Sequence, residues 1–433
     1  MGIIGKIGIP SLIIILVMLS LLAACSDDSK TEAPTPVGTP TATPTIIPTE
    51  TPTPTQEPAE DIVITIGNIS DMTGPGAMIF GVMNMVLDDL VEYYNEENLI
   101  PGVELKVVSY DTQYDPAKAI PGYEWVREKG ADIIYVIATP AVAVLTARAN
   151  DDKVVLFGPT AAQEDITPPG YVFSLGSVPQ CDGYTLIKWI AENDPDFPKD
   201  RPAKIGGASW TDGYSDKHMD ALEKYAENHP DQYEWVGTYL TPFTFIWGPE
   251  VEALKDCDYV YINPVMTQFA QEYRAAGYNA KFIGSVAHTT MMDQIDDADL
   301  WDEIDGTLIL NTSRWWNDEG TFVELSKELL QKNHASDAES LIRSGSGYLG
   351  ILVPYQMLEI IRQTIEAVGP KNFDTEALYS TAQSFSHTVD GIERYSYTDT
   401  KRASTNYMVI LEARGAEKDL FRVSEWVPII CAP

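Results

Sequence analysis

The stretch ADIIYVIATPAVAVLTARANDDKVVLFG, residues 131–158, sets the fold class of this chain. Residues 131–138 form a short stretch that is apolar throughout after Asp132, which is typical of a parallel strand buried on both faces. Residues 140–152 follow a helical pattern, and residues 153–158 form another apolar strand. A strand, a helix and a strand in this order predict an α/β protein with a parallel sheet and right-handed crossovers.

The same alternation extends in both directions from this stretch. Upstream, we expect strands at 61–70 and 103–112 and helices at 76–99 and 115–130. The alternation begins again after YVFSLGSVPQ (171–180), which predicts another lobe built like the first. The expected helices there cover residues 181–193, 215–230, 248–256 and 267–278, and the expected strands cover 203–209, 233–240, 258–264 and 281–287. A long amphipathic helix is expected at 348–369.

The N-terminus has the layout of a secretory signal peptide. Lys6 supplies a positive charge, residues 7–22 are almost all apolar, and the run closes on Ala23, Ala24 and Cys25. Residues 22–25 also resemble the lipobox of bacterial lipoproteins, which implies cleavage after residue 24 and a lipid on Cys25. The alternative is an uncleaved membrane span, but Pro10 interrupts the run and the ending on small residues and cysteine favours processing.

Residues 25–60 are dominated by threonine and proline. Such a segment buries too little apolar surface to fold, and its prolines keep it extended. We expect a stalk here, with the folded part beginning at Asp61. The net charge of −35, from 64 acidic and 29 basic residues, argues against nucleic acid as a partner.

The cysteines allow a limited disulfide framework. Of four cysteines, Cys25 is assigned to the lipid, which leaves Cys181, Cys257 and Cys431. These three allow one disulfide and one buried thiol, and the pairing stays open.

Five stretches together resemble the solute-binding lipoproteins of ABC importers, in the leucine/isoleucine/valine-binding class. They are SDMTGPGAMIFG (70–81), YDTQYDPAKAI (110–120), TPAVAVLTARANDDKVVLFGPTAAQEDIT (139–167), YVFSLGSVPQCDG (171–183) and EYRAAGYNAKFIGS (272–285). The closing RYSYTDTKRASTNYMVILEAR is similar to the last hairpin of that family.

The resemblance implies the type I periplasmic-binding-protein fold. That fold has two Rossmann-like lobes with parallel central sheets, joined by a three-strand hinge. Carried over to this chain, lobe one is 61–176 with 312–392, and lobe two is 177–311 with 393–433. The implied function is capture of a small solute by hinge closure, and the implied partner of the monomer is an ABC permease.

In lobe one, the resemblance implies a clamp for a carboxylate. Ala138, Thr139 and Pro140 offer a hydroxyl and a helix N-terminus. Thr160 and Ala162 form the other half, where an alanine occupies the position at which the family usually has a hydroxyl side chain. The alternative for Thr139 is a simple helix cap. Phe80 matches an aromatic that lines the solute, and its alternative is core packing.

In lobe two, the resemblance assigns Tyr214, Asn263 and Val286 to the site. The family has a carboxylate at the position of Val286, and no acid lies beside it here. A buried cation without a partner is unfavourable, so we expect an amino-acid-like solute that need not carry a free ammonium. His288 and Thr289 are candidate neutral hydrogen-bond partners. Trp210, Trp247, Trp315 and Trp316 are candidate walls of the site or ordinary core residues.

The sequence carries no motif of a catalytic, metal or cofactor site. It has no HExxH, no phosphate-binding GxxxxGK[ST] loop and no GxSxG elbow, and its five histidines have no metal-ligand spacing. We therefore expect no enzyme, no metal and no cofactor. The alternatives are a ligand-sensing surface receptor domain and, less in keeping with the resemblance, an α/β hydrolytic enzyme.

Overall fold

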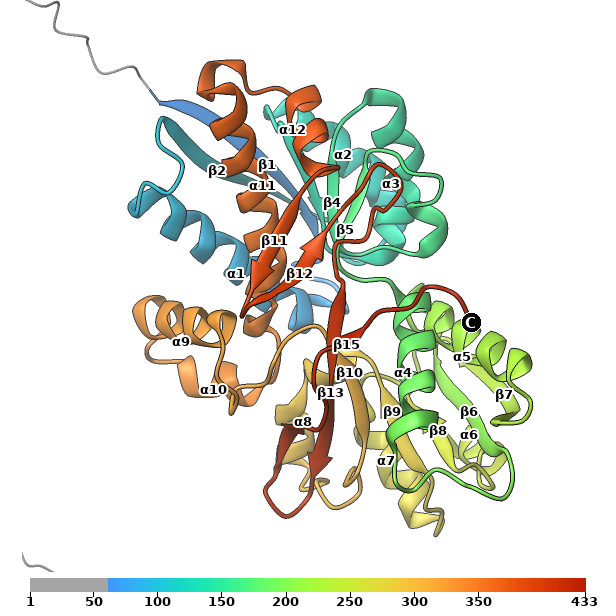
Figure 1. Ribbon diagram of the computed structural model, residues 1–433. Coiled ribbons are helices and arrows are strands. Elements are labelled where there is room, and N and C mark those ends of the chain that lie inside the picture. The colour runs from blue at the N-terminus through green and yellow to red at the C-terminus, as the bar shows by residue number, and fades with distance from the viewer. Residues whose placement is uncertain (1–60) are drawn as a thin grey trace, which may run out of the picture. The chain divides into compact units, whose positions relative to one another are not determined.

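A computed structural model describes residues 61–433, all of which belong to one compact unit, 58–433. The predicted signal peptide at 1–24, the stalk at 25–60 and the lipid-bearing Cys25 lie outside the described residues. Strands and helices alternate along the chain and build two sheets with helices on their faces (Figure 1). The predicted α/β class with two parallel-sheet lobes is confirmed.

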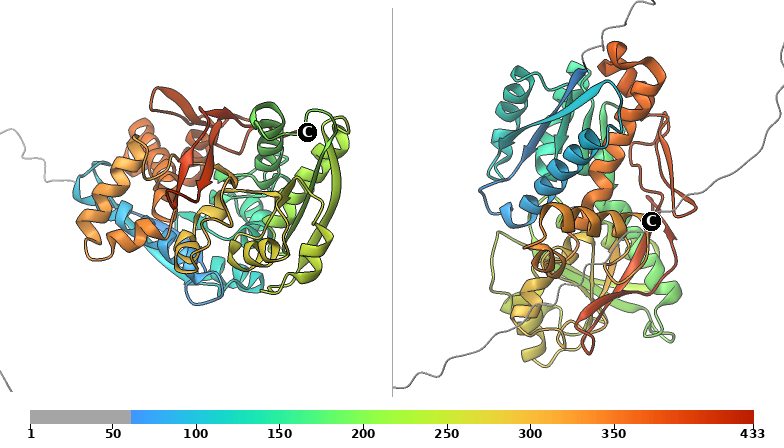
Figure 2. Two further views of the ribbon diagram at one scale, coloured as in Figure 1. Left: turned by 90° about the horizontal axis from the view of Figure 1, so that it is seen from below. Right: turned by 90° about the vertical axis from the view of Figure 1, so that its left-hand side faces the viewer.

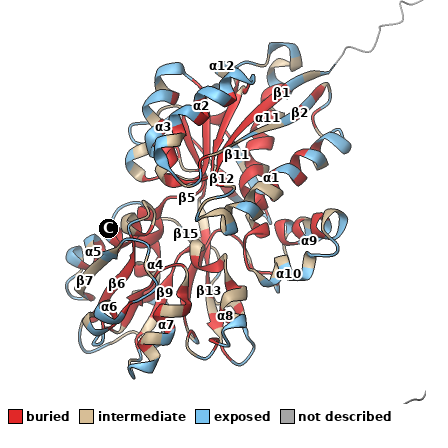
Figure 3. Cartoon of the chain, turned by 180° about the vertical axis from the view of Figure 1, so that it is seen from behind, coloured by how far each residue is buried: buried red, intermediate tan, exposed pale blue. Residues whose placement is uncertain are grey.

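The sheet of lobe one has five parallel strands in the order β2-β1-β3-β4-β5. They are β1 (Ile62–Ser70), β2 (Val103–Asp111), β3 (Ile133–Val136), β4 (Leu156–Thr160) and β5 (Val172–Ser177). Every residue of β3 is buried, as its continuous apolar run predicts. Figure 3 shows the buried sheet beneath helices whose outer faces are exposed.

Helices cover both faces of this sheet. Helices α2 (Ala119–Glu128) and α3 (Thr139–Asp152) share one core with Ile134 of β3, whereas α1 (Ala77–Glu96) and α11 (Leu352–Val368) share the opposite core with Ile133. Neighbouring residues of β3 therefore point to opposite faces. The expected helix from residue 348 starts as a 3-10 turn at Tyr348–Ile351, and the α-helix follows. The lobe-one side also carries α9 (Thr321–Asn333), α10 (Ala338–Arg343) and α12 (Thr375–Ala382).

The sheet of lobe two runs in the order β14-β13-β10-β9-β8-β6-β7, and β15 pairs with β13. Its strands are β6 (Ala203–Trp210), β7 (Tyr233–Thr241), β8 (Tyr259–Tyr261), β9 (Lys281–Gly284), β10 (Leu308–Asn311), β13 (Tyr407–Arg414), β14 (Asp419–Arg422) and β15 (Val427–Pro428). Strands β6 to β10 are parallel, and β13 is antiparallel to β10. The expected closing hairpin therefore extends the parallel part of this sheet.

Helices also cover both faces of the sheet of lobe two. Helices α4 (Pro179–Asn193) and α5 (Ser215–Asn228) contribute Leu186 and Met219 to the core on one face. On the other face, residues of α6 (Gly248–Ala253) and α7 (Met266–Ala275), such as Phe269, pack against the sheet. Helix α8 (Met292–Asp297) follows β9.

The chain passes between the two sheets three times: from β5 to α4, from β10 to α9, and from the hairpin β11 (Ser386–Val389)–β12 (Ile392–Ser396) to β13 (Figures 1 and 2). The third connection is bound to the first, because the Ser174 N–H donates to Arg402 O at 2.8 Å and the Thr405 hydroxyl donates to Gly176 O at 2.8 Å. The lobe boundaries at 176/177, 311/312 and 392/393 stay a prediction.

A disulfide joins Cys181 at the start of α4 to Cys431 near the C-terminus, across 250 residues. Cys257 is a buried free thiol. The sequence allowed one disulfide and one buried thiol, and the fold supplies the pairing that it left open. Within residues 61–433, no helix is both long and apolar enough to cross a membrane.

Candidate functional site

The predicted ligand-binding residues gather where the carboxyl-terminal ends of the two sheets meet. Residues 138–140 and 160–162 follow β3 and β4 of lobe one, whereas Tyr214, Asn263 and Val286 follow β6, β8 and β9 of lobe two. The two edges touch, because a Cβ atom placed on Gly213 would lie 3.0 Å from Pro140 Cγ. We call this region the interlobe site. It comprises residues 70–80, 111–114, 138–140, 160–162, 209–216, 261–263 and 285–288.

A pair of hydroxyl groups lies at the N-terminus of α3. Ala138 is the N-cap residue and makes no side-chain cap bond, and Thr139 is the first helical residue. The Thr139 hydroxyl is instead hydrogen-bonded to the Thr160 hydroxyl at the end of β4. The reading of Thr139 as a simple helix cap is therefore wrong, because its side chain faces β4. This places two hydroxyls beside the positive end of a 14-residue helix.

Ala162 lies beside this pair and is buried, with 4% of its surface exposed. Its side chain offers no hydrogen bond. Its backbone oxygen accepts from the Asp165 N–H at 3.0 Å, and the backbone of Ala162 also bonds the Asp165 carboxyl, which opposes the rise of that pKa by burial. The backbone N–H at this position therefore faces a carboxyl group of the protein.

A row of aromatic side chains connects the lobes at this site. Phe80 of α1 stacks on Tyr114 with ring centroids 5.8 Å apart, and Tyr114 meets Phe243 of lobe two edge to face at 6.3 Å. Phe243 packs against Trp210 at 4.9 Å. The Tyr114 hydroxyl also donates to Asp212 O at 3.3 Å. Sequence reasoning found Phe80 and Trp210 but missed Tyr114 and Phe243, which lie on loops without a periodic pattern.

The other candidate tryptophans belong to the core. Trp247 is fully buried against Phe269, and the indole N–H of Trp315 donates to Asp419 at 2.6 Å. The indole N–H of Trp316 donates to Gly345 O at 2.8 Å. For these three residues, the alternative of ordinary packing is the correct one.

Lobe two contributes buried polar groups that lack partners. Asn263 is fully buried and its amide donates to Val265 O at 2.6 Å, but its Oδ1 has no partner within residues 61–433. The same holds for Tyr261 Oη and Ser209 Oγ, which are also fully buried. Buried polar atoms are normally satisfied, so these three are candidates to bond a solute or water.

Tyr214, the N-cap residue of α5, connects the interlobe site to the first connection between the lobes. Its hydroxyl lies 3.3 Å from Ser177 Oγ, and Ser177 in turn donates to the buried carboxyl of Asp182. Burial and the negative charge of Asp182 raise the pKa of Tyr214, so the phenol is protonated and can donate.

Val286 is half-buried in a 3-10 turn and offers only an apolar surface. His288 in that turn bonds Ile262 O through Nε2 at 2.8 Å, and burial lowers its pKa to about 4. The hydroxyl of Thr289 bonds Val286 O at 2.7 Å and Ser346 Oγ at 2.6 Å. Both of these candidate partners are thus already occupied by the protein.

Carboxylates reach the interlobe site from loops other than the one at Val286. Burial raises the pKa of Tyr114, and the negative charges of Asp212, Asp71 and Asp216 around its hydroxyl raise it further. The Asp212 carboxylate accepts from the N–H groups of Tyr214 and Ser215 at 2.9 and 2.6 Å. Acidic groups therefore lie near the site from both lobes, which the sequence comparison at one position did not reveal.

Among residues 61–433, no group of three or more histidine, cysteine, aspartate or glutamate side chains is arranged to hold a metal. Two cavities are described, and neither is lined by the predicted ligand-binding residues. The site can hold an anionic group at α3, an apolar body on the aromatic row and a hydrogen-bond donor at the carboxylates.

Residues 63–417 match the model of a family described as periplasmic binding protein. A branched chain amino acid ABC transporter structure from Thermus thermophilus with bound valine superposes with a TM-score of 0.73 at 19% identity, over 85% of this chain and 97% of that one. A solute-binding protein from R. palustris in complex with benzoate superposes with a TM-score of 0.69 at 13% identity, over 86% and 98%. A fatty acid ABC transporter substrate-binding protein from Thermomonospora curvata superposes with a TM-score of 0.67 at 17% identity, over 84% of this chain and 92% of that one. No curated protein sequence matches the chain.

Proposed function

The chain belongs to the periplasmic binding protein family, and from this premise we propose that it is the solute receptor of an ABC importer. In this proposal, a small solute enters the interlobe site, the lobes close on it, and the closed form delivers it to a permease. The family is one of extracytoplasmic substrate-binding proteins rather than enzymes.

One observation carries the proposal: the hydroxyl pair of Thr139 and Thr160 at the N-terminus of α3, next to the contact of Pro140 with Gly213 of the other lobe. Free N–H groups and the dipole at a helix N-terminus favour an anion. A carboxylate held there by lobe one would lie next to the point at which lobe two contacts lobe one. Ala138, Pro140 and the backbone of Ala162 complete this half of the proposed site.

The rest of the interlobe site defines the proposed class of solute. Phe80 and Tyr114 offer an aromatic surface for an apolar body, and Val286 adds a further apolar contact. Tyr214 and Asn263 offer neutral polar groups. We propose an amino-acid-like solute, or a related small amide or carboxylate, whose donor group is met by Asp212 and Asp216 in place of the acid missing beside Val286. Valine and benzoate in the similar structures are solutes of this size.

Contacts between the lobes support the proposed closure. Lys217 of α5 pairs with Glu164 of lobe one at 2.5 Å, and the Tyr114 hydroxyl bonds Asp212 O at 3.3 Å. On the far side of the site, the Ser346 N–H donates to Thr289 O at 2.7 Å. The described conformation therefore has both lobes in contact, as a closed form requires.

We further propose that the mature chain is a monomer tethered to the cell membrane by a lipid on Cys25, with residues 25–60 as a stalk. The small residues Ala23 and Ala24 before Cys25, and the threonine- and proline-rich composition after it, support this proposal. The tether would keep the receptor near its permease.

A thermal-shift panel tests the proposed function. The panel would contain leucine, valine, the amide and the ester of each, urea, benzoate and 4-hydroxybenzoate. We expect at least one carboxylate-bearing compound to raise the unfolding temperature in a concentration-dependent way, because a ligand of the folded state stabilises it. A panel without any shift at millimolar concentrations would contradict the proposal for this class of solute.

A further inference from the structure

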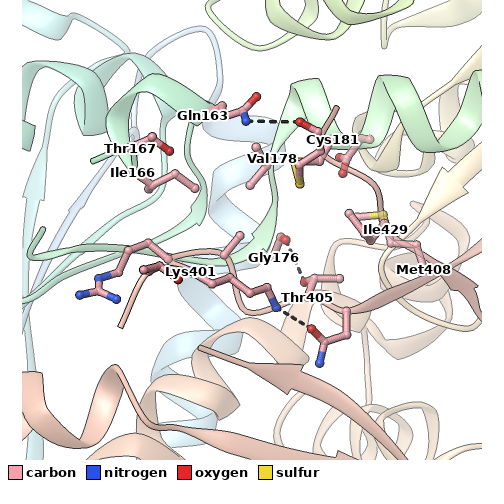
Figure 4. A pocket seen from close by; sticks show the side chains of 16 residues that line it. Gln163, Ile166, Thr167, Gly176, Val178, Cys181, Lys401, Thr405, Met408 and Ile429 are labelled. Atoms are coloured by element: carbon pink, nitrogen blue, oxygen red, sulfur yellow. Dashed lines mark hydrogen bonds between the residues drawn. A yellow bond between two sulfur atoms is a disulfide. The ribbon is translucent and has the colours of Figure 1, made fainter. Parts of the chain in front are cut away.

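A cavity of about 270 Å³ lies at the connections between the lobes, apart from the interlobe site (Figure 4). Gln163, Ile166 and Thr167 line it from lobe one, and Met408, Ile429 and Cys431 line it from lobe two. The remaining lining comes from the first and third connections and from the start of α4: Gly176, Val178, Cys181, Asp182, Thr400, Lys401, Arg402, Ala403, Thr405 and Asn406. We call it the hinge cavity.

The ammonium group of Lys401 is bonded only to neutral oxygens. It donates to Ser396 O at 2.9 Å, to Ser404 O at 3.3 Å and to Asn406 Oδ1 at 2.5 Å. Figure 4 shows its side chain running along the hinge cavity, with a dashed line at its ammonium group. Burial lowers the pKa of Lys401 to about 8, so the charge is present at neutral pH but is poorly solvated.

Arg402, its neighbour in the lining, is buried, with 2% of its surface exposed. Its guanidinium donates to Gly170 O at 2.9 Å, Thr398 O at 2.6 Å and the Tyr379 hydroxyl at 2.8 Å. Within residues 61–433, neither Lys401 nor Arg402 forms an ion pair, although the chain has 64 acidic residues against 29 basic ones. The hinge cavity is therefore next to two positive charges that form no ion pair, and the charge of Glu393 acts on Lys401 from beyond ion-pair distance.

One acidic side chain, Asp182, also belongs to the lining. It is buried, and its Oδ1 has no partner within residues 61–433, while Ser177 donates to Oδ2. Burial raises the pKa of Asp182 to about 7, which leaves the carboxyl largely protonated in mildly acidic solution. Under those conditions, the only charges in the lining are positive. A protonated Asp182 can also donate a hydrogen bond.

We propose that the hinge cavity binds a small organic anion, a carboxylate with a short apolar body. The carboxylate would lie at Lys401, where it would replace one of the three neutral oxygens that bond the ammonium and would form the ion pair that Lys401 lacks. The apolar body would pack on Ile166, Val178, Met408 and Ile429. The volume suits such a ligand.

This site is separate from the proposed solute site, and its existence does not depend on the proposed function. Because its lining comes from both lobes and from two of their connections, a change in the angle between the lobes changes the shape of the cavity. An anion bound there would therefore bind one arrangement of the lobes better than another. By thermodynamic linkage, it would change the affinity for the solute.

Methyl NMR at pH 6.5 tests the proposal on the full chain, with butyrate as the probe and butyramide as its neutral analogue. We expect butyrate to shift the methyl signals of Ile166, Val178 and Ile429 with saturable behaviour, and to leave those of Val286 at the interlobe site unchanged. Butyramide, which lacks the charge, should shift none of them. Shifts confined to Val286, equal shifts with butyramide, or no shift at 20 mM butyrate would each overturn the proposal.

Two variants test the assigned residues. Lys401→Met removes the charge, and Ile429→Trp fills the cavity while keeping the bond from the Ile429 N–H to Asn406 O. Each should weaken butyrate binding at least about tenfold, Lys401→Met because a charged hydrogen bond is lost and Ile429→Trp because the indole takes the volume of the ligand. Lys418→Met removes an exposed lysine elsewhere, and we expect it to bind like the wild type. Unchanged binding in folded Ile429→Trp would overturn the proposal even if Lys401→Met failed to fold.

Discussion

At the scale of single residues, the pair Thr139–Thr160 is the most direct test of where the solute binds. Thr139→Val keeps the shape of the side chain and removes the hydroxyl that bonds Thr160. We expect the affinity for the solute to fall about tenfold, which corresponds to about 1–2 kcal/mol for a lost hydrogen bond to a charged group. Calorimetric titration measures this loss.

The matched control is Thr146→Val on the same helix, because the Thr146 hydroxyl bonds only Val142 O within α3. This variant should bind the solute like the wild type. If Thr139→Val and the wild type bound the solute with equal affinity, Thr139 would not be part of the solute site.

Asp182 makes a prediction about the pH dependence of stability. Burial raises its pKa from 3.8 to about 7, so its favourable contribution is complete below pH 3.8 and is lost as the pH rises through 7. Asp182→Asn removes the ionisation. We expect the variant to gain stability relative to the wild type between pH 5 and pH 8, by on the order of 2–4 kcal/mol. Urea unfolding at several pH values measures the difference.

Asp220→Asn, at an exposed position on α5, serves as the control for Asp182→Asn. Both variants replace a carboxyl by an amide, so the effect of burial is the difference between them. If the difference in unfolding free energy between Asp182→Asn and the wild type were independent of pH, the Asp182 carboxyl would not be titrating in this range.

At the scale of elements, the loop between β6 and α5 is where lobe two touches lobe one. Gly213 in this loop has a φ of +79°, and a Cβ atom would lie 3.0 Å from Pro140 Cγ. Gly213→Val should therefore hold the lobes apart and weaken solute binding by more than tenfold. Gly277→Val has the same kind of backbone strain, at a φ of +83°, but its Cβ atom meets no neighbour within 4 Å.

Because strain at a positive φ is common to both variants, the difference between their solute affinities measures the contribution of the contact between the lobes. We expect similar losses of stability from the two changes, with a loss of solute affinity only in Gly213→Val. A loss of affinity of the same size in Gly277→Val would show that strain, not contact, is responsible.

The order of the elements was predictable because each follows from local pattern. The buried run at 133–136 is apolar at every position, and the helices carry apolar residues at helical spacing, so both lobes could be assigned from sequence. Thr139 could be assigned to the carboxyl-terminal edge of the sheet because residues 138–140 lie directly after a buried strand.

What could not be predicted depends on how distant loops meet. Tyr114 and Phe243 face each other from loops without periodicity, and only the packing of the two lobes brings them together. The carboxylates of Asp212 and Asp71 were missed for the same reason. The disulfide partners are separated by 250 residues, a pairing that spacing alone does not select.

At the scale of the whole molecule, the Cys181–Cys431 disulfide closes a loop of most of the folded chain. Cross-links over long loops restrict the unfolded state, and they typically stabilise a protein by about 2–4 kcal/mol. We expect reductant to lower the urea midpoint of the wild type accordingly. Cys431→Ser should show the lower midpoint already, without any further response to reductant.

If reductant left the wild-type midpoint unchanged, or lowered that of Cys431→Ser equally, the disulfide would not account for the stability. This outcome would concern the fold alone and not the proposed function.

The central claim is that the two lobes close on a solute held between them, and small-angle X-ray scattering tests it most directly. The protein would be measured without solute and with a saturating concentration of a compound that raises its unfolding temperature. We predict a smaller radius of gyration with the solute, and a scattering curve that approaches the one calculated for the described conformation of residues 61–433, in which Pro140 meets Gly213. An unchanged radius of gyration at saturation would contradict the account.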